Sequence, residues 1–145
     1  MPPESDVSID PRVLDAYRAA VYEVRVPGGA FVLRFGIRST ELEDLHSRHG
    51  VSSSAFLTAW NPRSRPTDAT RNERAQKDME ADLRAMDCTL FDGMGSDATG
   101  TWPAERSVLA LGISGAQARE VGGKYAQNAV LYMDADAVPD LLLIQ

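Results

Sequence analysis

The stretch VYEVRVPGGAFVLRF, residues 21–35, decides the fold class of this chain. It holds two apolar runs, Val21–Val26 and Ala30–Phe35, on either side of a Pro-Gly-Gly turn at positions 27–29. Within each run, large apolar side chains occupy every second position, which is the period of a strand with one buried face. Two such runs joined by a short glycine turn pair as antiparallel strands. The stretch therefore predicts a β-hairpin near the start of the chain.

Five further apolar segments follow the hairpin and predict the remaining strands. They are short, and turn or capping residues flank them, as is usual for the strands of one sheet. The expected strands are Ala55–Trp60, Cys88–Phe91, Ser107–Ile113, Ala129–Met133 and Leu141–Ile144. The glycine-rich segment Asp92–Pro103 is predicted to be a long loop.

Four helices are predicted from capping residues that precede apolar side chains at helical spacing. The expected helices run from Asp10-Pro11 to about Ala19, from Thr40 to about His49, from Thr67 or Asp68 to about Met86, and from Ser114 to about Ala126. Hairpins at both ends of the chain with helical crossovers between them predict an α+β fold. We expect a single mixed, mainly antiparallel β-sheet with helices packed against it.

Length and composition predict one globular domain. The 145 residues are 43% hydrophobic and 25% charged, which is ordinary for a globular protein and excludes a disordered or fibrous class. We expect residues 1–9 to form a flexible N-terminal tail and residues 10–145 to form a single α+β domain.

Charge and cysteine content indicate a cytoplasmic protein. The net charge of -6 disfavours binding to nucleic acid or to an anionic membrane, although the arginines between positions 61 and 74 could form a local basic patch. The lone cysteine, Cys88, cannot form an intramolecular disulfide. Residues 1–9 lack the apolar core of a signal peptide, and no apolar run is long enough to span a bilayer. We therefore expect no association with a membrane.

Three segments, residues 55–62, 100–107 and 125–130, carry polar side chains where packing alone does not require them. Glu105 and Ser107 are two positions apart, so in a strand they share a face. Aromatic and amide side chains at strand ends suit a planar or sugar-like ligand, and arginines beside them suit phosphate or carboxylate. The candidate site comprises Glu105 as the catalytic residue and Trp60, Asn61, Arg63, Asn72, Trp102, Ser107, Gln127 and Asn128 as ligand-binding residues.

The same segments carry a resemblance to a known family. They read FLTAWNP at 56–62, WPAERS at 102–107 and YAQNA at 125–129, with Asn72 between the first two and the apolar strand 109–113 before the third. Over roughly residues 17–133, the chain resembles an uncharacterised bacterial family, a domain of unknown function numbered thirty-two ninety-three. The resemblance implies no activity. Members of that family often carry a second acid near position 104, where this chain has Ala104, and this departure argues against a role that needs two adjacent carboxylates.

The polar residues also have a purely structural interpretation. Asn61 and Asn128 could hydrogen-bond to the backbone of turns, and Gln127 could cap a helix end. Both tryptophans could belong to the core, and Glu105 could pair with an arginine.

Two classes of function follow from these residues. The first is a non-catalytic binding or interaction domain for a small molecule or a protein partner, because the sequence contains no recognisable nucleophile–base pair. The alternative is a small enzyme, a hydrolase or a transferase, that uses Glu105 as general acid or base with Ser107 as a helper. We expect no cofactor and no metal site, since His46 and His49 have no third ligand near them in the sequence. The segment Leu141–Ile144 is either a core strand or a strand that pairs across a homodimer.

Overall fold

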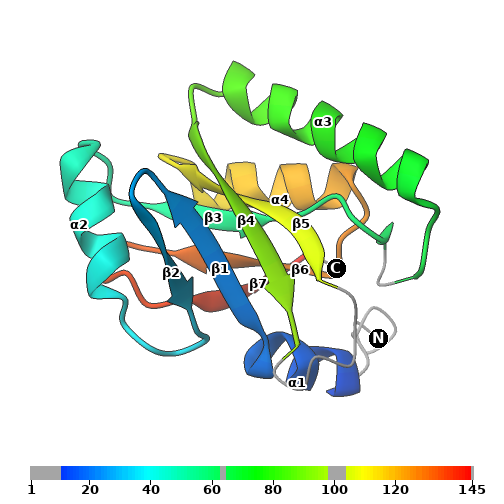
Figure 1. The fold of residues 1–145 in the computed structure, drawn as a ribbon, viewed down its shortest axis with the longest axis horizontal. Coiled ribbons are helices and arrows are strands. Elements are labelled where there is room, and N and C mark those ends of the chain that lie inside the picture. The colour runs from blue at the N-terminus through cyan, green and yellow to red at the C-terminus, as the bar shows by residue number, and fades with distance from the viewer. Residues whose placement is uncertain (1–10, 63–64, 98–103, 145) are drawn as a thin grey trace, which may run out of the picture.

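A computed structural model describes residues 11–62, 65–97 and 104–144 of the chain (Figure 1). The helices are α1 (Pro11–Ala19), α2 (Thr40–Arg48), α3 (Ala69–Ala85) and α4 (Gly115–Lys124). The strands are β1 (Val21–Val26), β2 (Gly29–Leu33), β3 (Ser54–Leu57), β4 (Thr89–Ser96), β5 (Glu105–Leu111), β6 (Ala129–Met133) and β7 (Asp140–Leu143). The helices and strands follow one another along the chain in the predicted order. The tail expected at residues 1–9 lies outside the described residues.

All seven strands belong to one curled sheet with the order β2-β1-β4-β5-β3-β6-β7 (Figure 1). Every neighbouring pair is antiparallel, so the described strands contain no parallel pair, and the α+β class is confirmed. The hairpin predicted from residues 21–35 is β1 and β2, in which Val24 lies opposite Phe31. The second hairpin, β6 and β7, forms the other edge of the sheet.

Alternation along the strands gives each face of the sheet its own apolar core. In β3, Leu57 packs with α3 and α4, whereas Phe56 points to the opposite face. The first core is completed by helix residues such as Met79 of α3, and the second by residues such as Leu42 of α2. Figure 1 shows α3 and α4 on one side of the sheet, with α1 on the other. In the described part of the chain, no helix is both long and apolar enough to cross a membrane.

The helix starts follow side-chain caps, and one predicted cap is wrong. The cap of α2 is Ser39 and not Thr40: the Ser39 hydroxyl oxygen accepts a hydrogen bond from the Leu42 amide at 3.0 Å. Ser39 is the residue that still has an extended backbone, whereas Thr40 already belongs to the helix. Ser114 caps α4 as predicted, in a capping box with Gln117.

Strand β4 extends into the segment that the sequence predicted to be a loop, so Gly93 and Gly95 are strand residues. A Cβ atom on Gly93 would lie only 2.6 Å from Cε2 of Phe56. Glycine at this position therefore makes room for an aromatic ring of another strand, a recognised reason for glycine in a strand interior. The remainder of the predicted loop, residues 98–103, lies outside the described residues.

Candidate functional site

A cavity of about 440 Å³ lies between α1 and the face of the sheet that carries Phe56. Tyr22 and Phe56 contribute aromatic rings from the sheet, and Ala16 and Tyr17 contribute the facing side from α1. Most of the lining is apolar, and it also includes the polar residues Asn61, Glu105, Ser107 and Gln127. The full lining consists of Arg12, Ala16, Tyr17, Ala20, Tyr22, Phe56, Thr58, Asn61, Gly95, Ser96, Asp97, Glu105, Ser107, Gln127, Ala129, Val130 and Leu131.

Strand β5 sends its first residues to opposite faces of the sheet. Glu105 and Ser107 both line the cavity, in agreement with their spacing of two positions. Arg106, between them, points to the other face, where it pairs with Glu73 at 2.6 Å and lies 3.8 Å from Glu80 of α3. The arginine next to Glu105 in sequence therefore does not neutralise it.

The Glu105 carboxylate is half-buried in the cavity lining. Its Oε2 accepts a hydrogen bond from Nδ2 of Asn61 at 3.1 Å. Among the residues that the structure describes, none forms an ion pair with it. Burial raises the pKa of Glu105 above its ordinary value, and the hydrogen bond from Asn61 opposes part of this change.

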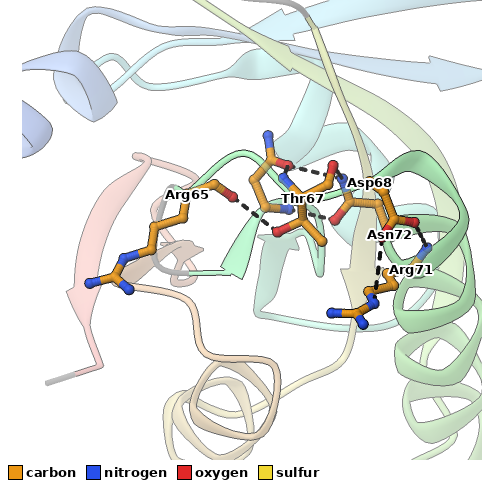
Figure 2. A network of polar contacts seen from close by, with 6 residues as sticks. Arg65, Thr67, Asp68, Arg71 and Asn72 are labelled. Atoms are coloured by element: carbon orange, nitrogen blue, oxygen red, sulfur yellow. Dashed lines mark hydrogen bonds and ion pairs between the residues drawn. The ribbon is translucent and has the colours of Figure 1, made fainter.

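Asn61 is fixed by a network that joins the end of β3 to the start of α3. Its Oδ1 accepts hydrogen bonds from Nδ2 of Asn72 at 2.9 Å and from the Thr67 amide at 3.0 Å. The backbone N–H of Asn61 donates a hydrogen bond to Oδ1 of Asn72 at 2.9 Å. Figure 2 shows Asn72 beside Thr67. It also shows Asp68, the N-cap residue of α3, in contact with Arg71. Asn61 has a positive φ of 47°, a conformation that asparagine tolerates better than most residues.

A buried polar row on α3 supports the same segment. Asn72, Gln76 and Glu80 are spaced four residues apart, and all three are buried. Oε1 of Gln76 accepts a hydrogen bond from the Ala59 amide at 2.9 Å, and its Nε2 donates to Glu80 at 3.3 Å. This bond explains why β3 ends at Leu57 and not at Trp60 as predicted: the Ala59 amide is bound to a side chain of α3 and not to a neighbouring strand.

The predicted site residues fall into three groups. Asn61, Glu105, Ser107 and Gln127 line the cavity together. Trp60, Asn72 and Asn128 do not line it, and Arg63 and Trp102 lie outside the described residues.

Several of these polar groups also serve the backbone. Nε2 of Gln127 donates to the carbonyl oxygens of Trp60 at 3.4 Å and Tyr125 at 3.2 Å. The Ser107 hydroxyl donates to the Glu105 carbonyl oxygen at 3.1 Å. Ser107 and Gln127 therefore have a structural role, because each donates a hydrogen bond to backbone carbonyl oxygens.

The aromatic and helical parts of the cavity were missed by sequence reasoning. Tyr22 is 7% exposed, and its ring meets Phe56 edge to face at a centroid distance of 5.3 Å. Its hydroxyl donates to the Tyr17 carbonyl oxygen at 2.6 Å, which ties α1 to β1, and burial raises its pKa. The alternation of Tyr22 with Val24 predicted only that this face is buried. It could not indicate that α1 leaves a space above it.

The histidines and the cysteine lie away from the cavity lining. His46 is buried and its Nε2 is 2.8 Å from the Ser54 hydroxyl, whereas His49 packs edge to face on Phe91. Cys88 is buried in the core that faces α3 and α4, and burial raises the pKa of its thiol. Within the described part of the chain, no group of three or more His, Cys, Asp or Glu residues is placed to hold a metal ion.

Comparison with known proteins places the chain in a family. No curated protein and no solved structure matches it. The model of a family described as "Protein of unknown function (DUF3293)" matches residues 57–130, from the last residue of β3 into β6. This segment contains the cavity residues Asn61, Glu105, Ser107 and Gln127, whereas α1 lies before it. The match covers slightly more than half of the sequence and agrees with the resemblance noted above, so the chain belongs to the DUF3293 family.

Proposed function

We propose that this protein is a small-molecule-binding domain whose ligand occupies the cavity between α1 and the sheet. The observation that carries the proposal is the cavity itself, about 440 Å³ in volume, with a mainly apolar lining that also contains polar residues from the sheet, such as Glu105, and from α1, such as Arg12. Small-molecule sites are typically cavities of roughly 300–1,000 Å³ that combine a mainly apolar lining with a few well-positioned polar groups. Size and chemistry therefore both suit a ligand.

A network of hydrogen bonds fixes the position of the Glu105 carboxylate, and a binding site requires such support for its polar groups. Asn61 contacts Glu105, and Asn61 is in turn fixed by Asn72 and by the Thr67 amide. A ligand that reaches Glu105 would therefore meet a carboxylate that is already oriented, and would lose little free energy in ordering it.

Acid–base catalysis is the second candidate function, and the raised pKa of Glu105 inside a cavity favours it. A carboxyl group whose pKa lies closer to neutrality can both accept and return a proton at physiological pH. In a hydrolase or a transferase of this kind, Glu105 would be the general acid or base. Ser107, on the same face of β5, would contact the substrate.

The first experiment is a thermal-shift screen of the wild-type protein and a variant with a filled cavity. Gly95→Leu is that variant, because a Cβ atom at Gly95 has no neighbour closer than 3.8 Å and the residue lines the cavity. A ligand at a hundred times its Kd adds about 2.7 kcal/mol to the free energy of unfolding, which is readily seen as a higher Tm. We expect compounds that stabilise the wild-type protein and fail to stabilise Gly95→Leu.

The matched control is Gly29→Leu, because Gly29 is also a strand glycine with open space where a Cβ atom would be, and it lies outside the cavity. A compound that stabilises the wild-type protein and Gly95→Leu equally binds elsewhere and argues against the cavity.

Glu105→Gln then separates the two candidate functions. A catalytic Glu105 predicts a variant that still binds ligand but no longer turns it over, whereas a pure binding domain has no turnover to lose.

A further inference from the structure

We infer that the ligand of this cavity is a small organic cation, an amine with an apolar body, whose ammonium group binds the Glu105 carboxylate. This inference rests on the proposed function, because it names the chemical class of ligand for the same cavity.

The first argument is that, among residues 11–62, 65–97 and 104–144, no basic side chain forms an ion pair with Glu105. Its Oε2 accepts from the neutral amide of Asn61, and no residue of the described ranges donates to its Oε1. The nearest arginine in sequence, Arg106, is bound to Glu73 on the far face of the sheet. A half-buried carboxylate is costly without a counter-charge. A cation in the cavity would provide one.

The second argument is the aromatic lining beside this carboxylate. Tyr17, Tyr22 and Phe56 all line the cavity. The hydroxyl of Tyr22 is bound to the backbone of Tyr17, so the ring is what Tyr22 offers to a ligand. Aromatic ring faces attract cations, and they also pack well against an apolar body. A carboxylate next to aromatic rings is thus a suitable site for an amine.

The third argument is the balance of charge around the cavity. Among the described residues, the titratable groups that line the cavity together with Glu105 are Arg12 and Tyr17 of α1, Tyr22 of β1 and Asp97 after β4. When both carboxylates are ionised, these described lining residues carry one more negative than positive charge. A carboxylate or phosphate ligand would be repelled by this excess, whereas an amine would be attracted.

The pKa of Glu105 makes a prediction about how binding of a cation depends on pH. Burial raises that pKa because it penalises the ionised form. An ammonium group favours the ionised form, and linkage requires that affinity for the amine rise as pH increases through the pKa of Glu105. Binding should weaken again only when the amine itself loses its proton.

Isothermal titration calorimetry with three probes of similar size tests the inference: 2-phenylethylamine, 2-phenylethanol and phenylacetate. At pH 8 we expect the wild-type protein to bind the amine at least tenfold more tightly than the alcohol and to bind phenylacetate most weakly. Lowering the pH to 4, below the ordinary pKa of 4.5, should reduce the preference for the amine several-fold, because most Glu105 carboxyl groups are then neutral. In Glu105→Gln, which keeps an acceptor for Asn61, the amine and the alcohol should bind with similar affinity.

Two control variants make the outcomes distinct. Asp97→Asn removes the other carboxylate of the lining and should leave most of the preference for the amine, while Gly95→Leu should abolish binding of all three probes. The inference is overturned if the alcohol or phenylacetate binds as tightly as the amine, if the preference survives in Glu105→Gln, or if no probe binds. Binding of the alcohol that is lost in Gly95→Leu, without a preference for the amine, would overturn the ligand class and leave the proposed function standing.

Discussion

Glu105 makes the stability of the folded protein depend on pH in one direction. Its folded-state pKa is raised above the ordinary value of 4.5 because the carboxyl group is buried. The folded state therefore binds the proton of Glu105 more tightly than the unfolded state does. The resulting stabilisation of the folded state is fully present below pH 4.5. The free energy of unfolding falls as the pH rises through the folded-state pKa.

Glu105→Gln removes this loss, so at pH 7 its free energy of unfolding should be higher than that of the wild-type protein. At pH 4 the two proteins should be equally stable. Urea denaturation at both pH values measures the difference. A variant that is less stable than the wild-type protein at pH 7 would mean that the ionised carboxylate stabilises the fold.

Gly93 and Gly95 offer a matched pair of substitutions in β4. A Cβ atom at Gly93 would meet the Phe56 ring at 2.6 Å and the Glu23 carbonyl oxygen at 3.0 Å, whereas one at Gly95 has no neighbour closer than 3.8 Å. We expect Gly93→Ala to lower the free energy of unfolding by about 1–3 kcal/mol through overpacking. Gly95→Ala should be neutral or slightly stabilising. Equal effects of the two substitutions on thermal denaturation would contradict the close approach of Phe56.

At the scale of the elements, the connection between β3 and α3 depends on the reciprocal contact of Asn61 and Asn72. Asn61→Ala removes three side-chain hydrogen bonds and places alanine at a φ of 47°. We expect it to destabilise the protein by about 2–3 kcal/mol. Asn61→Gly, which accepts the same φ, should be less destabilising. A double-mutant cycle with Asn72→Ala should give a coupling energy of about 1 kcal/mol or more, and additive effects would mean that the two side chains act independently.

His46 of α2 makes the free energy of unfolding depend on pH in the direction opposite to the effect of Glu105. Burial lowers the pKa of His46 below 6.5, although the nearby Glu43 raises it slightly. The unfolded state therefore binds a proton that the folded state excludes. The stability linked to neutral His46 is present above pH 6.5 and is lost as the pH falls through the folded-state pKa.

His46→Gln should accordingly flatten the dependence of the free energy of unfolding on pH between 5 and 7. The control is His49→Gln, which makes the same chemical change at an exposed position of the same helical region. If buried His46 is the source, this variant should keep the wild-type dependence. Urea denaturation over this pH range is the measurement, and NMR titration of the two rings assigns the pKa values directly. A steep dependence that persists in His46→Gln would assign the effect to another group.

At the scale of the whole molecule, the sequence is a good guide to the sheet and a poorer guide to the cavity. Local alternation predicted the hairpin of residues 21–35, because a strand with one buried face leaves that pattern in the sequence. A short apolar run predicted the bounds of β6, a strand whose residues are nearly all buried. The strand residues Gly93 and Gly95 were mistaken for a loop, because glycines in sequence usually indicate turns. The structural reason for Gly93 is the Phe56 ring, which lies far away in the sequence.

The candidate site divides in the same way. Glu105 and Ser107 share a face because of local geometry, so their proximity was predictable. The part formed by α1 and Tyr22 was not, since no local pattern indicates where a helix will leave a space above a sheet. Gln76 and Glu80 were also missed, because polar residues on a helix usually face solvent and their burial depends on the backbone of a distant segment.

The side-chain acceptors that hold the segment after β3 have a consequence for motion. The amides of Ala59 and Asn61 are bound to Gln76 and Asn72 of α3, and not to a strand or to a turn of helix. They are released when α3 separates from the sheet, even if α3 itself stays helical. Their hydrogen–deuterium exchange should therefore follow one shared rate, faster than that of the central strands, and Asn72→Ala should accelerate the exchange of Asn61 more than that of Ala59. These two amides would thus report how often the contact between α3 and the segment that carries Asn61, the partner of Glu105, opens.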